Sequence, residues 1–319
     1  MTTDFASKIK KGPVVAGPRI VIMGMEGVGK TTAAAQCPSP IFLCGENGLI
    51  GSAFSGIANY APENWADVLG FLEFILAGNH DYKTLVIDTI DWIEPLLHSH
   101  INKRDGKYLT KDRVTDGESI ENFNYQKGYV LALEEFRKAL AILDKIRLSG
   151  MIVVLNAHTH IKNFSNPEGE NYDRYELKIN AKLAGLIREW ADAMIFAKYE
   201  TFTGKIGKAG KSKGIGGQKR IVCTERTAAY DAKNRYSLPP EMPLDMAEIL
   251  EAIKKGESGD TTGIVEEINA YLPCVAESKR AAIANFIEEH KGDSVKLSQA
   301  LNKARVLAEQ QEQKGAVNA

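Results

Sequence analysis

The sequence predicts an α/β fold with a mostly parallel, doubly wound sheet, antiparallel strands at one edge, and a small helical appendage at the C-terminus. Two observations lead to this prediction. Short apolar runs rich in β-branched residues alternate with stretches of helical period, which is typical of a parallel sheet covered by helices. After about residue 258 the apolar runs stop, and only short helical patterns follow.

The chain is expected to divide into three parts. Its 319 residues allow one large domain with a small addition. Residues 1–17 are polar and broken by two Gly-Pro pairs, which predicts a flexible tail. Residues 18–257 then form the α/β domain and residues 258–319 the helical appendage. Helices are expected in the appendage at about 262–272, 276–290 and 294–312.

The strands of the main domain are predicted from apolar runs bounded by turn residues. Buried strands are expected at Arg19–Met23, Ile41–Cys44, Thr84–Ile87, Met151–Leu155 and Ala193–Ala197. A later antiparallel pair is expected at Arg220–Cys223 and Ala228–Tyr230.

The helices of the main domain follow from periodicity and from start and stop signals. They are expected at Lys30–Gln36, Glu63–Ala77, Gln126–Leu148 and Ala181–Trp190. Pro38 ends the first, Pro62 precedes the second, and Gly150 follows the third. Two polar insertions interrupt the pattern, at Asn102–Asn124 and Thr203–Lys219, and the second is rich in glycine and lysine and is expected to be mobile.

Composition and charge exclude several classes of protein. The formal net charge is -1, from 40 basic and 41 acidic residues, so any binding of nucleic acid must use local patches. No apolar run approaches the roughly 18 to 20 residues that span a bilayer, and the N-terminus lacks the apolar core of a signal peptide. The four cysteines form no CxxC pair, which favours a reduced, cytoplasmic protein without a membrane partner.

The strongest functional signal is a glycine-rich run, GMEGVGKT, at residues 24–31. It fills every fixed position of the pattern GxxxxGK[ST], and it lies between a predicted strand and a predicted helix. Backbone N–H groups of such a loop turn toward a phosphate, and the helix N-terminus adds its dipole. Lys30 would reach the β and γ phosphates of ATP, and the Thr31 hydroxyl would bind Mg²⁺. The nucleotide is expected to contact Gly24, Met25, Glu26, Gly27, Val28, Gly29, Lys30, Thr31 and Thr32.

Asp88 ends the apolar run that begins at Thr84. A carboxylate at the C-terminal tip of a buried strand is placed to hold Mg²⁺, usually through water. The alternative is that Asp88 caps the following helix. Its position after a phosphate-binding loop favours the metal role, as a Walker B aspartate.

Glu46 is the candidate for the residue that orients the attacking water. In many P-loop ATPases this carboxylate directly follows the Walker B aspartate, but here that position is Thr89. Glu46 follows the strand Ile41–Cys44, and a glutamate at the tip of a strand beside Walker B can serve instead. Asp91 and Glu94 lie further on, on the helix after the Walker B strand. The other interpretation of Glu46 is an exposed loop residue.

Taken in order, these residues resemble the RecA-like ATPases. The shared order is a phosphate loop, a strand ending in a glutamate, the Walker B strand, and a strand ending in a polar sensor. The sensor here would be His158, where RecA-like recombinases usually carry glutamine. The resemblance implies a RecA-like P-loop NTPase core.

The chain is more closely similar to a family of phage ATP-binding proteins of AAA type, small RecA-like ATPases linked to single-strand annealing. The resemblance covers about residues 19–240 and leaves the C-terminal helices out. It rests on runs at 124–129, 157–158, 190–193 and 232–236. It implies a DNA-stimulated ATPase that acts on single-stranded DNA in phage recombination or replication, in the host cytoplasm, with a single-strand-binding protein as a natural partner. A nucleotide-switched assembly module with little turnover is the alternative.

Lys233 and Arg235 resemble the KxR pair that RecA-like rings and filaments insert into the ATP site of a neighbouring subunit. Two cations spaced i, i+2 at a strand end point the same way and could both meet a γ-phosphate. This role implies a homo-oligomer, either ring or filament. The alternative is a basic turn after a strand.

Two further segments are candidates for contacts with DNA. The segment 161–178 mixes aromatic and basic residues, which suits base stacking and phosphate contact, but it also carries four acidic residues. A plain surface loop is the alternative. The insertion Thr203–Lys219 carries five lysines and no acidic residue, so it could contact a nucleic-acid backbone or simply be a solvated hairpin tip.

Overall fold

The computed structural model describes most of the chain. The described residues are 16–46, 48–105, 120–123, 125, 127–206, 211–258, 262–291, 296–297, 300–301, 303–305 and 307–308. Residues 1–15 of the expected tail and much of the insertion at 102–124 therefore lie outside them.

Ten strands form a mixed sheet, in the order β10-β8-β7-β1-β5-β4-β2-β3, while β6 pairs with β5 and β9 pairs with β7. β2 is parallel to β3 and β4, β4 is parallel to β5, and β8 is antiparallel to β7 and β10. The predicted α/β class is confirmed, with parallel strands in the middle and antiparallel strands at one edge. The strands are β1 (Arg19–Gly24), β2 (Pro40–Cys44), β3 (Ala58–Tyr60), β4 (Thr84–Asp88), β5 (Ile152–Phe164), β6 (Tyr172–Leu177), β7 (Ala193–Ile206), β8 (Lys211–Cys223), β9 (Lys233–Asn234) and β10 (Glu241–Pro243).

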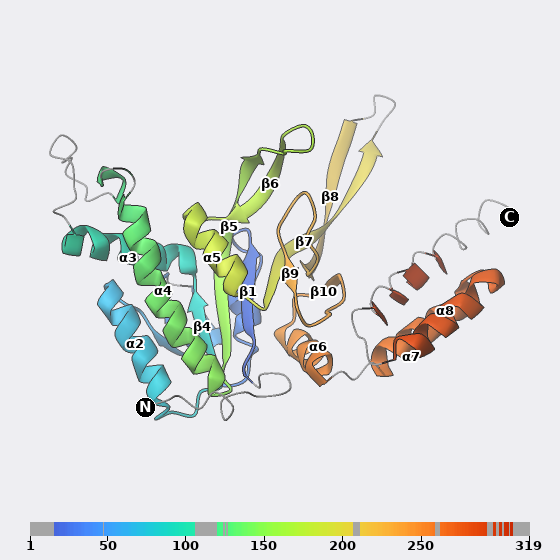
Figure 1. Cartoon of the computed structure of the whole chain (residues 1–319), viewed down its shortest axis with the longest axis horizontal. Helices are drawn as coiled ribbons and strands as arrows, with labels where there is room; N and C mark the ends of the chain where they lie inside the picture. The colour runs from blue at the N-terminus through green and yellow to red at the C-terminus, as the bar shows by residue number, and fades with distance from the viewer. Residues whose placement is uncertain are drawn as a thin grey trace, which may run out of the picture. The chain divides into compact units, whose positions relative to one another are not determined.

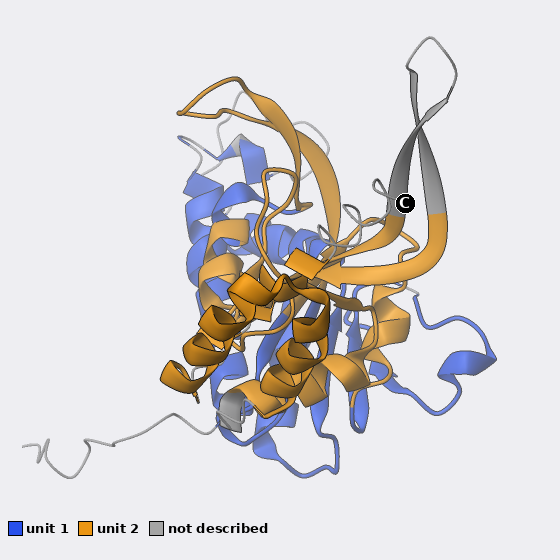
Figure 2. Cartoon of the chain, turned by 90° about the vertical axis from the view of Figure 1, so that its right-hand side faces the viewer, with its two compact units in different colours: residues 1–20, 38–155, 179–183 blue, residues 21–37, 156–178, 184–319 orange. Residues whose placement is uncertain are grey.

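The chain groups into two compact units (Figure 2). Unit 1 comprises residues 1–20, 38–155 and 179–183, and unit 2 comprises residues 21–37, 156–178 and 184–319. The chain passes from one unit to the other within β1 and again within β5.

In unit 1, three helices pack against one another (Figure 1). They are α2 (Trp65–Ala77), α3 (Ile90–Asp105) and α4 (Lys127–Leu148). Asn64 begins α2 as its N-cap, because its side-chain oxygen accepts a hydrogen bond from the Asp67 N–H at 3.1 Å. Gly78 ends α2 in a left-handed conformation, with φ of 74°. These local signals explain why the predicted bounds of this helix lie within two residues of the observed ones.

Unit 2 contains the helices α1 (Lys30–Ala34), most of α5 (Ala181–Trp190) and α6 (Met246–Ser258). An aromatic cluster fixes the loop after β8. The Phe196 ring lies 5.0 Å from that of Tyr175 and stacks on Tyr230 at 4.5 Å. The loop therefore packs across β6 and β7.

The antiparallel part of the sheet differs from the prediction. In the insertion at 203–219, residues 203–206 and 211–219 form the outer parts of β7 and β8, which agrees with the hairpin alternative, and its mobility stays a prediction. Backbone pairing of β7 with β8, with one register shift between Tyr199 and Thr201, outweighs the glycine- and lysine-rich composition there. The expected strand Ala228–Tyr230 is wrong, because Tyr230 forms a single bridge to Tyr175 and β8 pairs instead with β7 and β10. The helix α6 was not expected.

The C-terminal helices share a hydrophobic core. α7 (Thr262–Tyr271) and α8 (Glu277–Glu289) lie where helices are predicted, and the described residues between 296 and 308 are helical. The buried residues of this core are Ile268, Val275, Ile283, Ile287, Leu297, Leu301, Ala304 and Ala308. In the described part of the chain, no helix combines the length and apolar character needed to cross a membrane.

Candidate nucleotide-binding site

The glycine-rich run forms a strand-to-helix loop in unit 2, as its pattern predicts. β1 ends at Gly24 and α1 begins at Lys30. Gly27 and Gly29 have φ of 73° and 102°, conformations that residues with a Cβ rarely adopt. A Cβ on Gly24 would lie only 2.5 Å from the carbonyl oxygen of Ala197. The loop backbone can therefore take this shape only with glycine at these positions.

Lys30 folds back across the loop. Its ammonium donates hydrogen bonds to the carbonyl oxygens of Gly24 and Met25, both at 3.0 Å, and its side chain is 5% exposed. Burying a charge is costly unless it is hydrogen-bonded, so these two carbonyls hold the ammonium inside the loop. A cation held in this place, at the N-terminus of a helix, fits the phosphates of a nucleotide.

Two residues that the sequence did not single out lie against the loop. The Tyr199 hydroxyl on β7 donates a hydrogen bond to the Gly27 carbonyl oxygen at 3.1 Å. Arg220 lies opposite Tyr199 on β8, and a Cβ on Gly29 would come within 2.4 Å of its Nη1. The Arg220 guanidinium is exposed and makes no hydrogen bond or ion pair with any residue of the described chain. Its positive charge adds to the attraction that the loop exerts on an anion.

The predicted sensor lies near the loop. His158 on β5 is buried, and its backbone carbonyl accepts a hydrogen bond from the Lys178 N–H at 2.9 Å. The Lys178 ammonium in turn lies 3.3 Å from the Glu26 carboxylate. The backbone N–H of Glu26, then Lys178 and the charge of His158, keep the pKa of Glu26 below its ordinary value despite some desolvation. His158 is thus linked to the loop through Lys178, and its role as a sensor stays a prediction.

The two predicted carboxylates come from neighbouring strands of unit 1. β2 and β4 are parallel, with Cys44 in register with Asp88, and the Gly45 N–H donates to the Asp88 carbonyl oxygen at 2.8 Å. Burial, followed by the negative charges of Asp88 and Glu46, raises the pKa of the Cys44 thiol to about 11. The expected adjacency of the Glu46 strand and the Asp88 strand is therefore observed.

The rival carboxylates lie on α3, as expected. The Glu94 carboxylate accepts a hydrogen bond from the Asn180 N–H at 2.9 Å and lies 3.6 Å from Nε2 of His98. Burial raises the pKa of Glu94, the charge of Asp91 acts in the same direction, and the Asn180 N–H opposes both. Glu94 therefore ties α3 to the start of α5 within unit 1.

Lys233 and Arg235 have partners within their own chain. The Lys233 ammonium donates to the carbonyl oxygens of Arg188 and Glu189, at 3.0 and 2.8 Å. The Arg235 guanidinium lies 3.1 Å from Asp192, and its side chain is 54% exposed. Insertion into the ATP site of a neighbouring subunit would require both side chains to give up these contacts for contacts with the nucleotide.

The segment 161–178 is an antiparallel hairpin built from the end of β5 and from β6. The Phe164 and Tyr172 rings lie 5.3 Å apart, and the Arg174 guanidinium lies 5.0 Å above Phe164. Arg174 is 4% exposed and lies 3.8 Å from Asp231, so it is a buried support rather than a free cation. The aromatic pair and Lys162 remain as surface features of the hairpin.

Comparison with known proteins gives a family and a structural neighbour. A family model described as "AAA domain" matches residues 16–236. No curated protein matches the chain. One similar solved structure is the flagellar accessory protein FlaH from Methanocaldococcus jannaschii, with 14% identity over 73% of this chain and 94% of that chain, at a TM-score of 0.31. A structural similarity this low assigns no function.

Proposed function

The chain belongs to the AAA domain family and is a P-loop ATPase, and from this premise we propose that it hydrolyses Mg²⁺-ATP in response to single-stranded DNA. The single observation that supports the nucleotide site best is the buried ammonium of Lys30, held by the carbonyls of Gly24 and Met25. A lysine kept in this place is ready to exchange loop carbonyls for phosphate oxygens.

In the proposed reaction, the loop N–H groups and Lys30 bind the β and γ phosphates, and His158 senses the γ-phosphate. The Thr31 hydroxyl and the Asp88 carboxylate hold Mg²⁺, since oxygen ligands are the ones that this ion prefers. Mg²⁺ would neutralise charge that develops on the phosphate oxygens. Glu46 accepts a hydrogen bond from the attacking water and orients it toward the γ-phosphorus.

Arg220 extends this site beyond the motif. We expect Arg220→Gln to weaken ATP binding by roughly 10- to 150-fold, because a charge-assisted contact with phosphate contributes about 1.5 to 3 kcal/mol. ADP should be affected less if the guanidinium reaches the γ-phosphate. The measurement is titration calorimetry with a slowly hydrolysed ATP analogue and with ADP.

Lys219→Gln is the matched control for Arg220→Gln. Lys219 is also exposed, is adjacent on β8, and points to the opposite face of the strand. The Lys219→Gln variant should bind both nucleotides with the affinity of the wild-type chain. Equal losses of nucleotide affinity in the two variants would show that only the overall charge of β8 matters. Arg220 would then not be part of the nucleotide site.

The proposed DNA substrate rests on the resemblance of the sequence to phage recombination ATPases and on the hairpin of β5 and β6. Its Phe164–Tyr172 pair offers aromatic surface for bases, and Lys162 offers a cation for the backbone. We place the protein in phage recombination, annealing or replication, with a single-strand-binding protein as partner. Lys233 and Arg235 complete the ATP site of a neighbouring subunit, which makes the active unit a homo-oligomer.

If the active unit is an oligomer aligned on DNA, specific activity should rise with protein concentration and with added single strand. Arg235→Ala should lose the stimulation by DNA and keep ATP binding. Arg137→Ala, which removes an exposed arginine from α4, is the control and should retain stimulation. DNA affinity should fall steeply with salt, because its main contribution is counterion release.

One result would contradict the proposed action on DNA. It is an ATPase rate that is independent of both protein concentration and single strand, together with no salt-sensitive DNA binding. That result would favour a nucleotide-switched assembly module with little turnover.

A further inference from the structure

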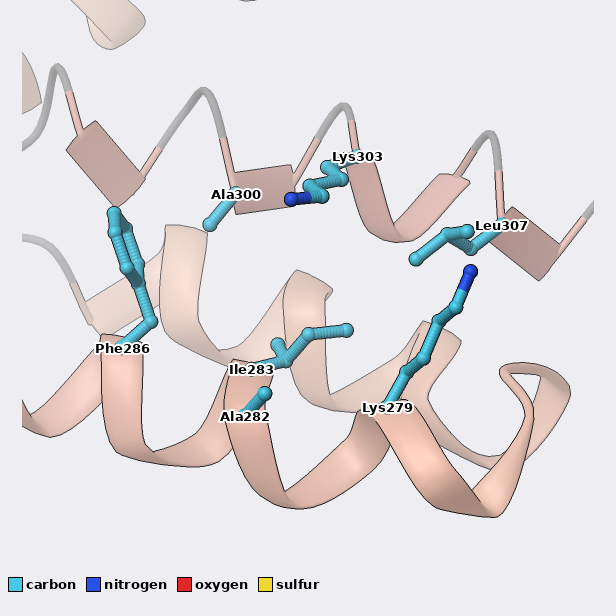
Figure 3. A pocket seen from close by; sticks show the side chains of 7 residues that line it. All are labelled: Lys279, Ala282, Ile283, Phe286, Ala300, Lys303 and Leu307. Atoms are coloured by element: carbon cyan, nitrogen blue, oxygen red, sulfur yellow. The ribbon is translucent and has the colours of Figure 1, made fainter.

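The C-terminal helices contain an apolar groove that the nucleotide site does not explain. It lies between α8 and the helical residues that follow, outside the family match at 16–236 (Figure 3). Its volume is about 640 Å³, which is in the range of pockets that accept ligands or several side chains. The lining residues are Lys279, Ala282, Ile283, Phe286, Ala300, Lys303 and Leu307.

The groove combines an apolar floor with two cations. The apolar surface between the two walls comes from Phe286, whose ring stacks on His290 at 4.1 Å, and from the partly buried Leu307 (Figure 3). Ile283 lies beneath them and is only 8% exposed. Lys279 extends from α8 and Lys303 from the facing segment. Neither lysine ammonium makes an ion pair or hydrogen bond with any residue of the described chain.

Other cations of these helices are compensated, which sets the two lysines apart. Arg305 pairs with Glu267 and lies over the Tyr271 ring. Arg280 donates to the carbonyl oxygens of Val275 and Pro273, at 2.8 and 2.7 Å. All three charged residues described between 296 and 308 are basic, and Lys303 is the one of them that lines the groove.

We propose that this groove binds an acidic, amphipathic helix of a partner protein. Apolar side chains on one face of such a helix, spaced i, i+3, i+4 and i+7, would fill the floor, as in other helix-in-groove complexes. Carboxylates at the edges of that face would meet Lys279 and Lys303. A nucleic-acid backbone offers charge but no aliphatic surface for Ile283 and Leu307, so charge complementarity together with the floor favours the peptide.

The test uses the full-length chain and fluorescently labelled 16-residue peptides in an anisotropy assay. The first peptide has leucines at helical spacing flanked by glutamates, the second replaces every glutamate with glutamine, and the third keeps the glutamates but has serine for leucine. We expect the first to bind, and the other two to bind at least about tenfold more weakly, because the groove needs both charge and apolar contact.

Variants locate the binding on the groove. The double variant Lys279→Glu/Lys303→Glu should bind the first peptide about tenfold or more weakly than the wild-type chain does. A peptide with lysine for glutamate should bind this variant better than it binds the wild-type chain. Ala282→Trp should also block binding, because Ala282 is exposed and lines the groove. The control Lys219→Glu/Lys254→Glu reverses two exposed lysines on β8 and α6 and should leave binding unchanged.

Three outcomes would overturn the proposal. One is failure of the first peptide to bind the wild-type chain. Another is binding that persists in both the double variant and Ala282→Trp. The third is displacement of the peptide by an oligothymidylate that itself depends on Lys279 and Lys303, which would make the groove a nucleic-acid site.

Discussion

Lys30→Ala is expected to abolish ATP turnover and to weaken nucleotide binding. The substitution removes the cation that the loop carbonyls of Gly24 and Met25 hold in place. In the proposed reaction the same ammonium contacts the β and γ phosphates, so its loss affects both the bound state and the transition state. Phosphate release should fall to the background rate, and titration with an ATP analogue should give a much higher Kd.

The loop itself must be monitored in this experiment, because Lys30 also stabilises the loop. Circular dichroism and thermal unfolding of Lys30→Ala should remain close to those of the wild-type chain. Lys178→Ala is a useful comparison, since it removes an exposed lysine that contacts the loop only through Glu26. It should retain most of the turnover. Hydrolysis by Lys30→Ala at a rate near that of the wild-type chain would defeat the entire assignment of the site.

Glu46→Gln is expected to preserve ATP binding and to lower kcat by roughly 10² or more, the usual effect of removing a positioned base. Glutamine keeps the size and polarity of the side chain but accepts a proton poorly. The change should therefore act on the chemical step rather than on binding. Single-turnover phosphate release, measured beside nucleotide affinity, separates these two effects.

Asp91→Asn and Glu94→Gln are the matched controls for Glu46→Gln, because each also replaces a carboxylate by its amide. Glu94 accepts a backbone N–H from Asn180, and a glutamine oxygen can accept the same bond. Both controls should keep turnover within a few-fold of the wild-type rate. Normal turnover by Glu46→Gln, together with loss of turnover in either control, would show that the water is oriented from α3 instead.

Local sequence signals predicted much of the fold. The glycine pattern, the caps of α2 and the apolar runs each act within a few residues, so the loop and the middle of the sheet could be located from the sequence. The parallel pairing that brings the Glu46 strand beside the Asp88 strand followed from the order of motifs. The roles of these residues in catalysis remain predictions.

Features that depend on distant pairing could not be predicted in the same way. Tyr199 meets Gly27 across 172 positions of sequence, and no local pattern marks it or Arg220 as part of the loop. The outer parts of β7 and β8 have a composition typical of a mobile loop, yet their pairing with each other makes them strands. The groove of the C-terminal helices arises from tertiary packing, so helical periodicity alone gave no sign of it.

The most direct test of the central claim is steady-state phosphate release by the purified wild-type chain, with Mg²⁺-ATP or with ATP and a chelator, each with and without single-stranded DNA. We expect turnover that requires Mg²⁺, rises with protein concentration and is stimulated by the single strand. ATP that binds tightly but is not hydrolysed above background under any of these conditions would contradict it.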